Sequence, residues 1–272
     1  MNVFLPEMFV EHVDRLALGL EPRDAVSRLR PARLVDIAVD GPPQLGADPP
    51  AWLEPNAIAG RPTLHRHGSG RYVLLFAAHV DTPVDVRLVP RDRRYVPRRL
   101  RFAIPAIATV LTAETAGTDI PTTSRIWGPT LFPGATYDVV DSQTTVRGRV
   151  TRGGRPVRWT RVEASADGHV VGRAHGDDRG EFLLVLGQNT GAVGDLQPSL
   201  PVTIDVYARD PELPVDPTDP LGDLPLEPAA PAASVPDDVS AGVELPGNYV
   251  LVAHLLNQPL TLGRPTSVPI AV

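Results

Sequence analysis

Residues 180–186 read Gly-Glu-Phe-Leu-Leu-Val-Leu, and residues 70–76 read Gly-Arg-Tyr-Val-Leu-Leu-Phe. In both stretches a glycine precedes a run whose large apolar side chains recur at every second position, which is the period of a β-strand with one buried face. We therefore expect two sets of side chains to fill equivalent core strands of a duplicated module: Tyr72, Leu74 and Phe76 in the first, and Phe182, Leu184 and Leu186 in the second.

The sequence around these two stretches repeats in the same order. Residues 201–210 match residues 83–92, because each segment begins with Pro-Val, alternates apolar and polar residues, and ends in Arg-Asp. Upstream, residues 157–168 end in Asp-Gly, as residues 33–41 do. The spacings between these signals drift, as they do in a duplicated domain with inserted loops.

The composition agrees with an all-β fold. The 31 prolines and 23 glycines favour short elements with frequent turns over long helices. A chain of 272 residues is long enough for two domains that each bury a core. The absence of cysteine excludes a disulfide framework, a thiolate metal site and a cysteine nucleophile. We predict two tandem Ig-like or transthyretin-like β-sandwiches joined by proline-rich connectors.

These signals also predict a division of the chain. The expected segments are an N-terminal docking arm (1–14), β-sandwich 1 (15–105), a connector (106–140), β-sandwich 2 (141–210), a proline-rich linker (211–245) and a C-terminal docking segment (246–272). We expect the connector to pack through Ile104, Ile107, Val110 and Leu111. The linker holds eight prolines between Pro211 and Pro236, a composition typical of extended, semi-rigid chain.

Charge and hydropathy exclude some classes of partner. The formal net charge is −6, and all 26 basic residues are arginine, so the chain lacks the basic excess that phosphate recognition normally needs. The first residues carry Glu7 and Glu11 without a basic leader, and no apolar run reaches the ~18 residues of a membrane span. We expect no nucleic-acid partner, no membrane insertion, and a location in the cytoplasm or within a released particle.

The run from Thr145 to Asp210 carries an ordered set of strands and turns. A strand with an early glycine (146–150) leads to Gly-Arg-Pro-Val at 154–157, and a short glycine-bearing strand (171–174) leads to Asp-Asp-Arg-Gly at 177–180. This order resembles the carboxypeptidase-regulatory-like, or transthyretin-like, β-sandwich family. The resemblance implies an interaction or spacer domain without an active site of its own.

Three shorter strings resemble proteins of phage-tail-like contractile injection systems. They are Tyr-Val-Pro-Arg-Arg at 95–99, Leu-Phe-Pro-Gly-Ala at 131–135 and Arg-Ala-His-Gly-Asp-Asp-Arg-Gly-Glu-Phe at 173–182. The chain has none of the long self-assembling elements expected of a sheath or tube subunit. The resemblance therefore implies an accessory subunit at the cap end, as a cap adaptor, or on the baseplate, with sheath, tube, cap or baseplate proteins as partners.

Two polar clusters are candidate metal sites. His65, His67 and His79 could supply three imidazole ligands to zinc or iron, although the same residues also read as the tip of an Arg-His loop. A second cluster could hold calcium through oxygen ligands: His175, Asp177, Asp178 and Glu181. Asp-x-x-Gly before a strand is the ordinary chemistry of a tight turn, and we prefer that interpretation. We expect no metal and no cofactor.

The sequence lacks a pattern for nucleophilic catalysis. Gly68-Ser69-Gly70 does not have the Gly-x-Ser-x-Gly spacing, and Arg179 stands at the position of Ser69 in the repeat. We therefore expect no catalytic residue and no enzymatic activity. The alternative to a structural role is a free-standing binding module for a carbohydrate or protein ligand, for instance one that recognises carbohydrate through Trp127 and Trp159.

Residues expected to bind partners fall into three groups. The stretch from Arg91 to Arg101 holds six arginines around Tyr95, and it reads either as an anion-binding patch or as a solvated edge strand protected by charge. Both chain ends are too apolar to be left in water and too short to bury themselves. The residues expected to contact partners are Arg94, Tyr95, Arg98 and Arg99 in the patch, Phe4, Leu5, Met8 and Phe9 in the arm, and Tyr249, Leu251 and Leu255 in the C-terminal segment.

These features predict a non-catalytic structural adaptor of a contractile, phage-tail-like particle. The two rigid sandwiches would act as spacers, and the arm, the linker and the C-terminal segment would act as docking strips. We accordingly expect that deletion of residues 1–13, or of everything from Pro211 onward, spares the folding of both sandwiches.

Overall fold

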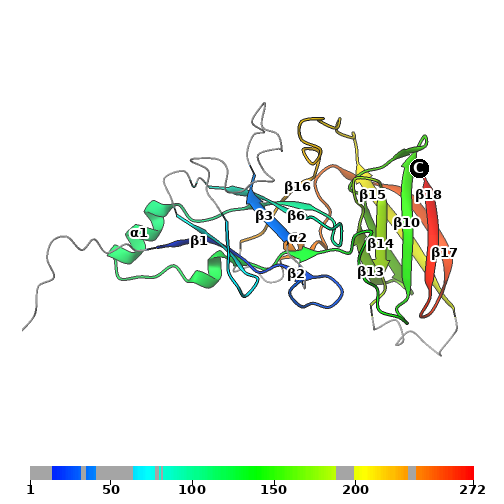
Figure 1. Ribbon diagram of the computed structural model, residues 1–272, viewed down its shortest axis with the longest axis horizontal. Helices are drawn as coiled ribbons and strands as arrows, with labels where there is room; N and C mark the ends of the chain where they lie inside the picture. The colour runs from blue at the N-terminus through cyan, green and yellow to red at the C-terminus, as the bar shows by residue number, and fades with distance from the viewer. Residues whose placement is uncertain are drawn as a thin grey trace, which may run out of the picture.

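The structure, a computed structural model, describes residues 14–31, 35–40, 64–76, 80, 82–187, 199–231 and 237–272. Strands dominate this part of the chain, so the predicted all-β class is confirmed. Figure 1 shows two groups of strands side by side, with the strands of the second group running across the long axis of the molecule. Among the described residues, no helix is long and apolar enough to cross a membrane.

The first sandwich consists of two four-stranded sheets. One sheet has the order β4 (His65–Arg66), β5 (Tyr72–Leu75), β1 (Leu16–Leu20) and β8 (Ile126–Trp127). The other has the order β16 (Leu226–Pro228), β7 (Arg98–Phe102), β6 (Val84–Pro90) and β3 (Val35–Val39). Between β7 and β8 lie α1 (Ile107–Thr115) and the 3-10 helix η1 (Thr122–Arg125), and a small ribbon pairs β2 (Arg23–Asp24) with β9 (Thr130–Leu131).

The second sandwich also consists of two sheets. In one, β10 (Thr145–Arg152) pairs with β14 (Glu181–Val185), with β11 (Arg155–Pro156) and with β18 (Pro265–Ala271). The other has the order β13 (His169–His175), β12 (Arg161–Ala166), β15 (Ser199–Arg209) and β17 (Tyr249–Thr261). The short helix α2 (Asp238–Ala241) precedes β17, and the Asp237 side chain caps it by accepting a hydrogen bond from the Ser240 N–H.

The two sandwiches share their strand pairing. β1 pairs antiparallel with β5 and parallel with β8, just as β10 pairs antiparallel with β14 and parallel with β18. β6 lies between β3 and β7 in antiparallel pairing, and β15 lies between β12 and β17 in the same way. The repeat in the sequence is therefore matched by equivalent pairing in both sheets.

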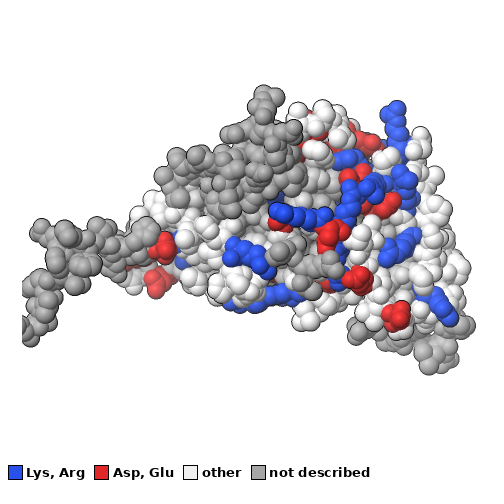
Figure 2. Space-filling view, viewed as in Figure 1, with Lys and Arg blue, Asp and Glu red and all other residues white. Residues whose placement is uncertain are grey.

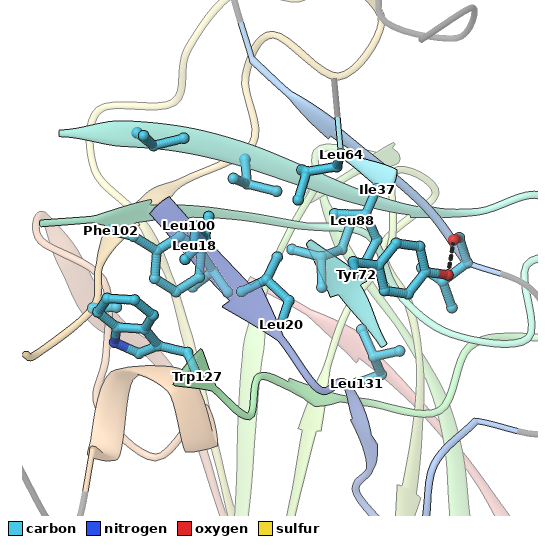
Figure 3. Packing of buried hydrophobic residues seen from close by; sticks show 14 of the residues in the cluster. Leu18, Leu20, Ile37, Leu64, Tyr72, Leu88, Leu100, Phe102, Trp127 and Leu131 are labelled. Atoms are coloured by element: carbon cyan, nitrogen blue, oxygen red, sulfur yellow. Dashed lines mark hydrogen bonds between the residues drawn. The ribbon is translucent and has the colours of Figure 1, made fainter. Parts of the chain in front are cut away.

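The predicted core alternation is confirmed in both modules. Tyr72 and Leu74 are buried in the first core with Phe76 packed against them, and the second core buries the other predicted set: Phe182, Leu184 and Leu186. Leu183 is also buried, because the outer face of β14 packs on the core of the first sandwich. Figure 3 shows the first core, where the rings of Phe102 and Trp127 lie 5.1 Å apart between their centroids.

The turn before β14 explains two glycines of the second module. The Asp177 carboxylate accepts hydrogen bonds from the N–H groups of Arg179 and Glu181, at 2.8 and 2.9 Å. Gly180 has φ +70°, and a Cβ there would lie 2.5 Å from the Val150 carbonyl oxygen. On β10, a Cβ at Gly148 would lie 2.2 Å from the Phe182 ring, so glycine leaves the space that this ring fills. The preferred interpretation of Asp-x-x-Gly as a tight turn is confirmed.

The expected connector and the expected C-terminal docking segment instead supply closing strands. β8 lies within 106–140 and pairs with β1, while β17 and β18 lie within 246–272 and pair with β15 and β10. A long insertion in the sequence separates these closing strands from the rest of each module, so local pattern does not show that they complete its sheets. Two expected anchors of the connector are buried, Ile104 and Val110, whereas Ile107 and Leu111 are exposed.

The described part of the expected linker is also part of the fold. β16 runs parallel to β7 and extends its sheet, with Pro228 at the edge, where a missing N–H costs no ladder bond. Deletion from Pro211 onward would remove strands from both sandwiches. The expectation that such a deletion spares folding is therefore wrong.

We predict that Phe182→Ala lowers the free energy of unfolding by about 3–5 kcal/mol, since the ring is buried in the second core over Gly148. Chemical denaturation measures this change. Val140→Ala is the matched control, because this side chain is 69% exposed and its truncation should change stability by less than about 0.5 kcal/mol. A loss below about 1 kcal/mol for Phe182→Ala would contradict its placement in the core.

Candidate functional site

Arg98 lies at the centre of a buried junction between the two sandwiches. Its guanidinium on β7 is fully buried, and its Nε and Nη2 donate to the two carboxylate oxygens of Glu227 at 3.2 and 2.9 Å. Nη1 donates to the carbonyl oxygens of Thr130 and Ser240 at 2.9 and 2.8 Å, and Nη2 also donates to that of Val239 at 2.6 Å. All the N–H groups of the side chain are thus used, as burial of a guanidinium requires.

Glu227 connects this arginine to the second sandwich. Its Oε1 atom also accepts a hydrogen bond from Nη2 of Arg161 at 3.2 Å, and Arg161 lies on β12. The three side chains are nearly inaccessible to solvent, so each charge depends on the others for compensation. One carboxylate from β16 therefore holds an arginine from each sandwich. We call Arg98, Glu227 and Arg161 the triad.

Further contacts bind residues 211–231 to both sandwiches. Asp219 accepts two hydrogen bonds from buried Arg87 of β6, at 2.7 and 2.6 Å. Asp223 accepts two from Arg158 of the second module, at 2.6 and 2.9 Å, and Leu224 is buried with Trp159 and Val96. We call residues 211–231 the strap, because they bind both sandwiches through charged and apolar contacts.

The arginine side chains of the expected patch form ion pairs with carboxylates of the same chain. Arg91, Arg94 and Arg101 pair with Asp36, Asp138 and Asp85, respectively. Arg93 pairs with Asp178, and Arg99 pairs with Asp40. On the face shown in Figure 2, arginine and carboxylate side chains lie next to each other around the junction rather than in large patches of one sign.

Two residues expected to contact a partner are therefore misassigned. Tyr95 and Arg98 are 3% and 1% exposed, so neither can reach a partner at the surface. β7 is also an internal strand between β6 and β16, not the solvated edge strand considered above. Local pattern around the arginines does not predict their burial, because most of the acidic counter-charges lie far away in the chain. Arg98 and Glu227, for example, are separated by 129 residues.

Tyr95 takes part in a second buried polar cluster. Its hydroxyl and that of Tyr137 both donate to the buried Asp24 carboxylate, at 2.8 Å from Tyr95 and 2.9 Å from Tyr137. Burial and the neighbouring carboxylate raise the pKa of Tyr95 to about 12, and they raise the pKa of Tyr137 as well. Both phenols therefore remain hydrogen-bond donors throughout the physiological pH range.

His175 is buried beside Arg98 and Arg161 of the triad with Glu227. Its ring stacks on Phe132 with 3.8 Å between centroids and an interplanar angle of 15°, and the Gly242 backbone lies against its Nε2 atom. Burial, and then the positive charges of Arg161 and Arg98, lower the pKa of His175 well below its usual value. The ring is therefore neutral at the junction near pH 7.

The candidate metal ligands do not converge where the structure describes them. Within the described ranges, no group of three or more His, Cys, Asp or Glu side chains could hold a metal ion. The Nδ1 atom of His67 is hydrogen-bonded to the Ser69 hydroxyl at 2.8 Å, His65 is exposed on β4, and His79 lies outside the described residues. Asp177 of the second cluster forms the turn described above.

The tryptophans of the alternative function do not form a binding platform. Trp127 and Trp159 are each 3% exposed, and the Trp127 Nε1 donates to the carbonyl oxygen of Ala230 in the strap at 2.8 Å. Neither indole can stack on a sugar from these positions, so this basis for carbohydrate recognition is wrong.

The C-terminal residues expected to bind partners lie on β17, in the second sandwich. The Tyr249 hydroxyl donates to the Trp159 carbonyl oxygen at 2.7 Å, and Leu255 packs partly against the second core. Leu251 is 51% exposed. The arm residues Phe4, Leu5, Met8 and Phe9 lie outside the described residues.

Comparisons with known proteins give little further information. No family model and no curated protein matches the chain. Among solved structures, the chain is similar to a crystal structure of a 9R-lipoxygenase from Cyanothece PCC8801, with a TM-score of 0.28 and 10% sequence identity over 51% of this chain and 18% of that chain. The match thus spans less than a fifth of the lipoxygenase, and a likeness at this TM-score carries no argument about fold or function.

We predict that Glu227→Gln lowers the free energy of unfolding by about 3–5 kcal/mol, because it leaves two buried guanidinium groups without their counter-charge. Denaturant titration at neutral pH measures the loss. Glu212→Gln is the control, since Glu212 pairs with Arg152 at the exposed surface and its loss should cost at most about 1 kcal/mol. Equal effects of the two substitutions would contradict the role of Glu227.

We predict that acid destabilises the wild-type chain more than a His175→Gln variant. The folded-state pKa of His175 is lowered, so below about pH 6.5 the unfolded chain binds a proton that the folded chain does not, and stability falls by up to about 1.4 kcal/mol per pH unit. Unfolding measured between about pH 7 and pH 5 should show a shallower decline for the variant. Parallel curves for the two proteins would rule out His175 as the titrating group.

Proposed function

We propose that this chain is a non-catalytic structural adaptor, in which the strap joins two β-sandwiches into one rigid spacer. The observation that carries the proposal is the Glu227 carboxylate shared by Arg98 of the first sandwich and Arg161 of the second. A hinge between domains needs an interface that opens at low cost, whereas opening this one would expose or orphan buried charges. The charged side chains of the junction form ion pairs with one another, which favours a structural role that keeps the two sandwiches in a fixed arrangement.

The proposal extends to a place in a phage-tail-like contractile particle, at the cap end or on the baseplate. Its support is the resemblance of the three short strings, which are distant in sequence but meet at the junction. Tyr95 forms a bridge with Pro133, the Val96 N–H donates to the Phe132 carbonyl, and the Phe132 ring stacks on His175. The strings therefore belong to one structural unit.

Capture from the native host tests this function. A tagged chain should be recovered in particles that sediment as large assemblies and contain sheath, tube and baseplate-type subunits at fixed ratios, identified by mass spectrometry. A chain deleted for residues 1–13, which carry the apolar arm, should fold but fail to enter the particle. Recovery of the full-length chain without such subunits would contradict the particle assignment, and full incorporation of the deletion variant would contradict the docking role of the arm.

A further inference from the structure

The edge of β17 differs from the equivalent edge of the first sandwich. β17 corresponds to β7, because both pair antiparallel with the central strand of the duplicated sheet. In the first sandwich, β16 of the strap covers the other side of β7. In the second, β15 is the only strand paired with β17 in the described part of the chain. One module thus has an added strand at a position that the other leaves open.

β17 has few of the features that normally protect an exposed edge. It is 13 residues long, and its sequence from Tyr249 to Thr261 contains no Asp, Glu, Lys or Arg. Val250, Leu251 and Leu256 are 43%, 51% and 60% exposed. Its protective features are two irregularities in its register with β15, the single Pro259, and His254, whose Nδ1 is hydrogen-bonded to the Asp205 carboxylate of β15. A long, largely apolar edge without Asp, Glu, Lys or Arg is a template for pairing with another strand.

Other edges of the second sandwich are protected. The Val272 N–H bonds to the Thr151 carbonyl, so the alternate residues Pro265 and Pro269 face the free edge of β18 and remove two donors from it. The edge strand β13 is shorter and carries Arg173, which is ion-paired with Glu163. Leu183 on the outer face of β14 is covered by the first sandwich.

We propose that β17 is a homodimer interface, at which β17 of one copy pairs antiparallel with β17 of a second copy. The second copy is the occupant because the long open edge of this chain is complemented by the same edge, and a strand without Asp, Glu, Lys or Arg sets none of these charges against its own copy. Antiparallel pairing of a strand with itself has two-fold symmetry, so it closes at two copies. β17 lies on the side of the second sandwich away from the first (Figure 1).

The dimer goes beyond the proposed function and does not depend on it. It assigns a copy number and a surface, whereas the adaptor role concerns incorporation into a particle. The tests are also separate, since the dimer is measured on the purified chain alone.

Sedimentation velocity on the purified full-length chain tests the proposal. At about 50 µM the wild type should sediment as a dimer, twice the 29.2 kDa chain mass, and dissociate on dilution. A Leu251→Lys/Leu256→Lys double variant places four like charges along the two paired strands, and its dissociation constant should rise by at least about tenfold. Val170→Lys is the matched control, since Val170 is 43% exposed on β13, at the opposite edge of the same sheet, and this variant should remain dimeric.

Hydrogen exchange on the wild type provides a second measurement that needs no variant. Amides between Tyr249 and Thr261 should exchange more slowly at high than at low protein concentration, while those of β13 should not change. A wild type that stays monomeric throughout would overturn the proposal. A dimer that survives the double lysine substitution, or that is lost in Val170→Lys, would place the interface elsewhere and overturn it equally.

Discussion

The arrangement of the two sandwiches depends on one buried carboxylate. Glu227 compensates Arg98 and Arg161 in a place where neither guanidinium has access to water, and it comes from a segment that belongs to neither repeat. Burial of three charges is costly unless their geometry and hydrogen bonds are complete. Here the remaining Arg98 donors are matched by the backbone carbonyls of Thr130, Val239 and Ser240, so the triad also fixes β9 and α2.

The strap explains why the two duplicated modules are joined to each other instead of forming independent domains. Asp219, Asp223 and Glu227 recur at intervals of four residues, and they reach Arg87, Arg158 and the central pair of arginines. The strap therefore crosses the junction through a series of turns at residues 216–224 followed by β16, with its carboxylates distributed between the sandwiches. Its prolines restrict the unfolded chain, so less conformational entropy is lost when the strap is ordered.

Local pattern predicted most of what is local in this fold. Period-two alternation located β5, β6, β14 and β15 and assigned the buried faces of Tyr72 and Phe182 correctly, because the pleat alone determines those features. The junction could not be predicted in this way, since partners such as Arg98 and Glu227 are distant in sequence. Arginine-rich stretches are also usually exposed to solvent, so their burial is not expected from the sequence. One signal was present in the sequence of the strap. Its acidic residues recur at regular intervals among prolines, and their charge is complementary to that of the arginine-rich stretch at 91–101.

The prolines have a different role in the folded chain from the one that composition suggests. Composition assigns them to turns and connectors, whereas several of them lie in strands. Proline has no N–H to donate, so within a sheet it is tolerated only where the ladder needs no donor. Pro201 and Pro259 lie opposite each other in the register of β15 and β17, Pro228 lies on the edge strand β16, and Pro265 and Pro269 face away from β10. These residues therefore limit where further strands can be added, and a proline-rich sequence of this kind can specify the edges of sheets as well as the connectors between them.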